Sequence, residues 1–93
     1  MLTYEDCLGF CDLTSDEIDA IAHHEHLPEI VALELGQYLV QSQEGVVMIR
    51  RMIIDDIEMA RSRNDLSRYL VLKATLKHFV ETHPERPANH AAA

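Results

Sequence analysis

The 93-residue chain is poor in the residue types that define several large classes of protein. Its two cysteines, Cys7 and Cys11, are too few for a disulfide scaffold, and they are not spaced as C-x-x-C. No run of about 18 apolar residues could cross a membrane, and the opening MLTYEDCLGF lacks the basic and apolar regions of a secretory signal. We therefore expect a cytoplasmic protein with reduced cysteines.

Lysine and arginine are missing from the first half of the chain. Residues 1–49 contain ten acidic side chains and no Lys or Arg, whereas residues 50–93 contain six acidic and eight basic side chains. An acidic half of this kind repels nucleic acid and anionic membranes, so we predict neither as a partner. The opposite charges of the two halves favour attraction within one chain, between subunits, or toward a basic surface on another protein.

Apolar residues recur at helical spacing, and no segment shows the alternation of a strand. Thr14 and Glu17 form the S/T-x-x-E spacing of a capping box, Pro28 suits a first helical turn, and Asn64 or Asp65 can cap a helix. We predict an all-α protein, a compact bundle of one short and four longer helices, at residues 4–11, 14–25, 28–42, 46–63 and 66–83. They form a single helical domain over residues 1–83, followed by a flexible tail over residues 84–93.

The third predicted helix is apolar over most of its circumference, and its polar residues form one narrow stripe at Glu34, Gln37 and Gln41. A helix so broadly apolar either occupies the centre of a bundle or is partly covered by another subunit. Two-fold dimers are the commonest oligomers. We therefore predict a homodimer whose interface contains Ala32, Leu35, Gly36 and Leu39.

Three polar residues, Glu25, Asp56 and His83, fall within apolar helix faces. A buried carboxylate needs partners, because an unpaired buried charge costs several kcal/mol. The first interpretation is structural: Asp56 accepts hydrogen bonds from a helix N-terminus or an arginine, which would hold its pKa below the usual value. The second interpretation is that the three residues converge on a metal or proton-transfer site.

Residues 22–30, AHHEHLPEI, contain three closely spaced histidines at positions 23, 24 and 26. His23 and His26 are three apart and could share a ligand face on a helix, but Pro28 disfavours helical backbone just before it. Neither H-E-x-x-H nor the Glu-x-x-His of di-iron bundles occurs in the chain. The favoured interpretation is a helix boundary with solvated histidines. The alternative is a transition-metal ion held by the following residues: Glu25, Asp56, His83, His23 and His26.

Catalytic motifs are missing as well. No serine lies in a nucleophile elbow, and the three glycines form no phosphate-binding loop. We therefore predict a non-enzymatic association module, either a homodimer or an adaptor for a protein partner. The alternative hypothesis is a metal-binding helical protein that uses buried carboxylates and histidines.

Overall fold

The computed structural model describes residues 3–9 and 11–84. Within these ranges the chain forms five helices and no strand, which confirms the predicted all-α class. The helices are α1 Tyr4–Gly9, α2 Ser15–Glu25, α3 Glu29–Leu39, α4 Gln43–Ser62 and α5 Leu66–Thr82. The predicted flexible tail, apart from Pro84, lies outside the described residues.

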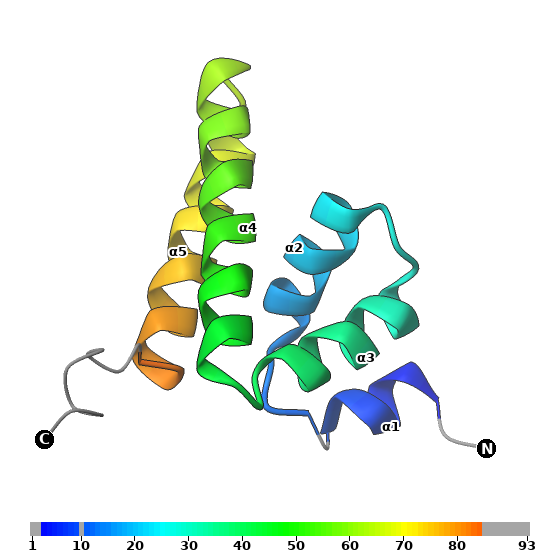
Figure 1. The fold of residues 1–93 in the computed structure, drawn as a ribbon. Coiled ribbons are helices and arrows are strands. Elements are labelled where there is room, and N and C mark those ends of the chain that lie inside the picture. Colours follow the sequence, from blue (N-terminus) through cyan, green and yellow to red (C-terminus); the bar gives the residue numbers. More distant parts are fainter. Residues whose placement is uncertain (1–2, 10, 85–93) are drawn as a thin grey trace, which may run out of the picture.

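Helices α4 and α5 form a long antiparallel hairpin, and α1, α2 and α3 lie together on one side of it (Figure 1). The turn of the hairpin projects beyond α2, and neither α1 nor α3 lies beside this end of the hairpin (Figure 1). The Cα atoms extend over 43 × 41 × 19 Å. The molecule is therefore flat, and much helix surface lies on its two broad faces.

Side chains at the helix starts form the caps that the sequence predicts. The Glu17 backbone N–H donates to Thr14 Oγ1 at 3.2 Å, and the Thr14 N–H donates to Glu17 Oε1 at 2.8 Å, so the capping box is complete. Asp65 caps α5 by accepting from the Arg68 N–H at 3.2 Å. These two helix starts could be predicted because each depends on residues three positions apart.

Helix α4 begins earlier than the sequence predicts. The predicted helices at 28–42 and 46–63 leave residues 43–45, QEG, between them, but Ser42 accepts from the Gly45 N–H at 3.0 Å and starts the helix at Gln43. Gly45 is buried, and a Cβ at this position would collide with the backbone of Leu39. The glycine therefore permits the close approach of two helices and does not interrupt one.

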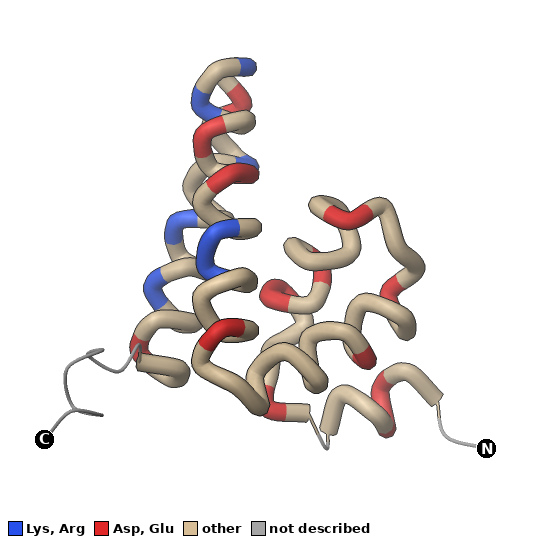
Figure 2. The backbone as a smooth tube through the Cα atoms, in the orientation of Figure 1, with Lys and Arg blue, Asp and Glu red and all other residues tan. Residues whose placement is uncertain are grey.

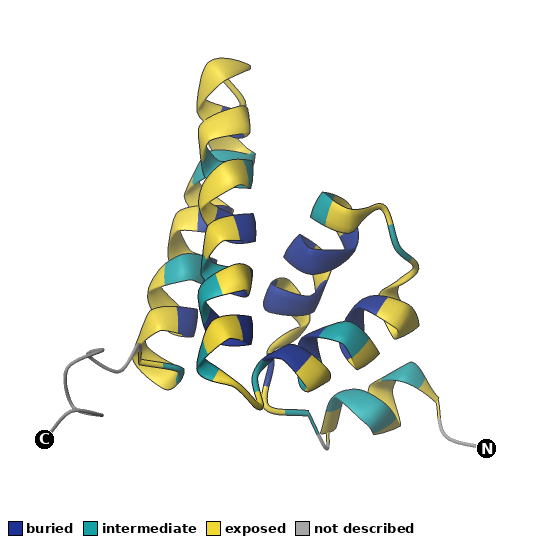
Figure 3. Cartoon of the chain, viewed as in Figure 1, coloured by how far each residue is buried: buried dark blue, intermediate teal, exposed yellow. Residues whose placement is uncertain are grey.

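The core lies where α2, α3, α4 and α5 meet (Figure 3). Its largest fully buried apolar side chains are Phe79, Ile18, Ile21, Ile49 and Ile53. None of the helices in the described part of the chain is long and apolar enough to span a bilayer.

The four residues predicted to form a dimer interface mostly lie inside this core. Ala32 is 0% exposed and Leu39 is 6% exposed, Gly36 is buried and Leu35 is half-buried. The missing side chain of Gly36 lets Leu13 approach α3 closely, since a Cβ on Gly36 would lie 2.5 Å from Leu13 Cδ1. This close neighbour belongs to the same chain. The prediction that these residues form a dimer interface is corrected, because Ala32, Gly36 and Leu39 are buried within the chain itself.

Candidate functional site

A cluster of charged side chains joins α2 to the α4–α5 hairpin. We call Asp19, His23, Asp56 and Arg68 the Asp56 cluster. The side chain of Asp56 is 11% exposed, and its Oδ2 lies 3.9 Å from Arg68 Nη2 and 4.0 Å from His23 Nδ1. Arg68 Nη1 lies 3.8 Å from Asp19 Oδ2. Neither Asp56 Oδ2 nor Arg68 Nη2 has a hydrogen-bond partner within the described residues, so the cluster is held by charge alone.

Burial, rather than pairing, dominates the protonation equilibrium of Asp56. Loss of water raises the pKa of its carboxyl, and the opposing effects of His24, His23 and Arg68 are smaller. The expectation that an arginine would hold this pKa below its usual value was wrong. The reason is geometric: the guanidinium is 3.9 Å away and donates no hydrogen bond that would compensate for the lost water.

His24 lies beside this cluster, between two carboxylates on opposite sides of its ring. Its Nδ1 is 2.7 Å from Glu25 Oε2, and its Nε2 is 3.6 Å from Asp55 Oδ2. Burial lowers the pKa of His24, but the hydrogen bond to Glu25, the charges of Asp56 and Glu25, and the polar contact with Asp55 together raise it above the ordinary value. Because the two carboxylates contact different ring nitrogens, they do not converge on one point where an ion could bind.

The residues predicted as metal ligands are not brought together. Glu25 is exposed, and His26 ends α2 in the left-handed conformation with φ 58°. His83 stacks on Phe79 with ring centroids 4.6 Å apart, about 22 Å along α5 from Arg68. Within the described residues no three His, Cys, Asp or Glu side chains are arranged to hold a metal ion. Of the predicted set, only His23 and Asp56 approach one another.

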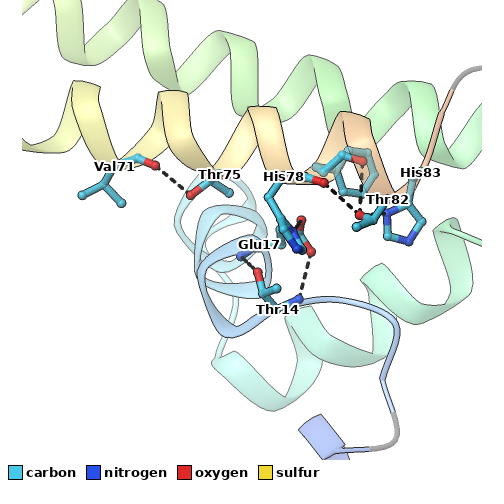
Figure 4. A network of polar contacts seen from close by, with 8 residues as sticks. Thr14, Glu17, Val71, Thr75, His78, Thr82 and His83 are labelled. Carbon is cyan, nitrogen blue, oxygen red and sulfur yellow. Dashed lines mark hydrogen bonds and ion pairs between the residues drawn. The ribbon is translucent and has the colours of Figure 1, made fainter.

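A second polar contact also joins α2 to the α4–α5 hairpin, and the sequence did not predict it. Glu17 is 0% exposed, and its Oε2 lies 3.0 Å from Nδ1 of His78 on α5 (Figure 4). The sequence identified Glu17 as a capping residue but not as a buried one. A signal was present, because Glu17 lies four residues before Ile21 and so shares its buried face. The partner, His78, could not be found without the fold.

The hairpin carries an exposed strip that none of these contacts uses. We call Leu66, Leu70, Lys73 and Lys77 the α5 outer stripe. At helical spacing they lie within about 60° of one another, opposite the buried Leu72 and Phe79. Leu66 is 66% exposed and Leu70 is 58% exposed.

Helix α3 presents a complementary exposed strip. We call Ile30, Glu34 and Tyr38, which are spaced by four residues, the α3 outer stripe. Ile30 is 41% exposed, Tyr38 is 72% exposed, and Glu34 is exposed between them. Cations mark the hairpin, whereas α1, α2 and α3 carry carboxylates and no Lys or Arg (Figure 2). The two stripes therefore differ in charge while both are partly apolar.

Comparisons of the chain with protein-family models, with curated proteins and with solved structures found no significant match. A functional proposal for this protein therefore depends on its own side chains.

Proposed function

We propose that this chain is a non-enzymatic association module that forms a homodimer through the α5 outer stripe. The observation that carries the proposal is the exposure of two leucines one turn apart, Leu66 at 66% and Leu70 at 58%, on a hairpin that projects from the rest of the fold (Figure 3). Burying a leucine side chain contributes roughly 1.5–3 kcal/mol. In a two-fold dimer both leucines of both copies lose water, which is a substantial driving force.

The polar clusters of the molecule support a role without catalysis. The Asp56 cluster and the Glu17–His78 contact both lie where α2 meets the hairpin, and each joins the two parts of the fold. A structural role accounts for these residues without a substrate. The surplus of carboxylates on α1, α2 and α3 keeps nucleic acid away from that side of the molecule.

Sedimentation velocity of the purified wild-type chain and of two variants tests the proposal. We expect the wild type to sediment as a dimer at up to about 100 µM, a range that detects even weak association. Leu70→Glu places a charge in the stripe and should give a monomer. The matched control is Met48→Glu on α4, which changes a residue that is 51% exposed and lies outside the stripe, and it should remain a dimer. A wild-type chain that is monomeric at the highest concentration would refute the proposal.

A further inference from the structure

Ion pairs join α2 to the α4–α5 hairpin, and we call the surface where they lie the α2–hairpin junction. Three of these pairs have a histidine as their cation: His23–Asp56 at 4.0 Å, His24–Asp55 at 3.6 Å and His78–Glu17 at 3.0 Å. A fourth pair, Arg68–Asp19 at 3.8 Å, has a permanent cation. Histidine gains or loses its charge between about pH 5 and 8, so bound protons set most of the attraction across this junction.

The ring of His24 shows how a proton changes a contact at this junction. Its Nδ1 is 2.7 Å from Glu25 Oε2, so the single N–H of the neutral ring belongs on Nδ1. The lone pair of Nε2 then faces Asp55 Oδ2, 3.6 Å away on α4, and the two repel each other. A second proton, on Nε2, makes this contact attractive. Burial opposes that protonation, but the neighbouring carboxylates outweigh burial and raise the pKa of His24.

His23 and His78 depend on a proton to different degrees. Nδ1 of His23 lies 4.0 Å from Asp56 Oδ2, too far for a hydrogen bond, so this contact is attractive only when the ring is charged. Arg68 approaches the same carboxylate and opposes a second cation there. His78 Nδ1 lies 3.0 Å from Glu17 Oε2, a hydrogen bond that a neutral ring can donate and that protonation strengthens.

Neutral histidines leave the junction with an excess of negative charge. Its other charged groups are Glu17, Asp19 and Glu25 of α2, Asp55 and Asp56 of α4, Arg68 of α5, and Arg63, which lines the same small cavity as His23 and Asp56. These are five carboxylates and two guanidinium groups, and three bound protons make the numbers of negative and positive charges equal. Proton uptake therefore replaces repulsion between α2 and the hairpin with attraction.

We propose that the α2–hairpin junction is a pH-sensitive switch: protonation of His23, His24 and His78 holds α2 against the hairpin, and loss of these protons loosens it. The stabilisation is present below the pKa of histidine in the unfolded chain and is lost as pH rises through the pKa in the folded state. Ile18 and Ile21 of α2 are fully buried in either state, so the switch changes how often α2 opens locally and leaves the fold intact. The proposal does not depend on the homodimer.

Hydrogen exchange of the backbone amides of α2, measured by mass spectrometry on the full chain, tests this proposal. Protection factors correct for the direct effect of pH on exchange, and they should be roughly threefold to a hundredfold higher at about pH 5.5 than at about pH 8. A triple variant with His23→Gln, His24→Gln and His78→Gln should lose most of this difference. Burial raises the pKa of Asp56, which leaves a small difference of the same sign.

A permanent charge gives the opposite test. His23→Lys keeps a cation opposite Asp56 at every pH and should raise the protection of α2 at about pH 8. The matched control is His26→Asn, at the end of the same helix. The His26 side chain forms no ion pair or hydrogen bond within the described residues, and asparagine tolerates its left-handed backbone at φ 58°. This control should keep the wild-type pH dependence.

Three results would overturn the switch. The first is equal protection of α2 at both pH values in the wild type. The second is a pH difference of full size in the triple variant, with circular dichroism showing unchanged helix content. The third is unchanged protection at about pH 8 in His23→Lys. Position 23 is exposed, so this last variant keeps the fold and decides the matter even if the triple variant does not fold.

Discussion

Replacing Glu17 by alanine should destabilise the protein more than any replacement of an exposed carboxylate. The side chain is 0% exposed, accepts from the Thr14 N–H at 2.8 Å and contacts His78 Nδ1 at 3.0 Å. In Glu17→Ala the Thr14 N–H loses its acceptor, which costs about 1–2 kcal/mol. The space left by the buried side chain costs about a further 1–2 kcal/mol. The expected loss in the free energy of unfolding is about 2–4 kcal/mol.

That loss is large for a chain of this length, whose total stability is about 5–14 kcal/mol. It should lower Tm by about 8–32 °C, because each kcal/mol shifts Tm by about 4–8 °C in a domain of this size. Urea unfolding followed by circular dichroism measures the free energy directly. Glu17→Gln keeps an oxygen acceptor and the side-chain volume, so it should lose about half as much.

The control is Asp16→Ala, which removes an exposed carboxylate from the same first turn of α2 and should cost about 0.5 kcal/mol or less. A loss of less than about 0.5 kcal/mol in Glu17→Ala would show that neither hydrogen bond contributes to stability. The assignment of Glu17 as the residue that joins α2 to α5 would then be wrong.

Three further changes test other contacts, each by urea unfolding. Because folding raises the pKa of Asp56, the free energy of unfolding falls as the pH rises through the pKa that Asp56 has in the folded state. Asp56→Asn should therefore stabilise the protein by about 1 kcal/mol or less at neutral pH and leave its stability unchanged in acid. A destabilised variant would contradict this. Because folding raises the pKa of His24, the charged imidazole stabilises the fold at about pH 5.5, and this stabilisation is lost above the pKa that His24 has in the folded state. His24→Gln should therefore cost a few tenths of a kcal/mol in acid only. An equal loss at about pH 8 would refute this. Gly36→Leu should cost about 2–3 kcal/mol because a Cβ there lies 2.5 Å from Leu13 Cδ1, and wild-type stability would show that this contact relaxes freely.

The parts of the fold that could be predicted from the sequence depend on residues close together in the chain. The caps at Thr14 and Asp65 involve a side chain and a backbone N–H three residues away, and both formed as predicted. The start of α4 could not be predicted in this way. Gly45 lies just before the predicted start at residue 46, but its role is set by the backbone of Leu39, which approaches it only after α3 and α4 have packed.

The candidate site was harder to predict because burial depends on which face of a helix finds a neighbour. The apolar breadth of α3 is real, but Leu13 and Ile21 cover Gly36, and Ala32 is fully buried, so most of the expected interface became core. Glu25, on the other hand, lies near the end of α2, where the buried face of the helix has run out, and its side chain is exposed. Helical phase places residues on a common face of a helix, but only the packing of the helices decides whether that face is covered and by what.

The segregation of charge along the chain is used only in part by the fold. Contacts between α2 and the hairpin involve Arg68 and three histidines, at His23, His24 and His78, opposite carboxylates. Helices α1, α2 and α3 contain no Lys or Arg, so these few contacts leave most of their negative charge uncompensated. The lysines of the α5 outer stripe likewise have no carboxylate partner within the described residues. Charge that folding leaves unpaired remains available to attract and orient a second copy.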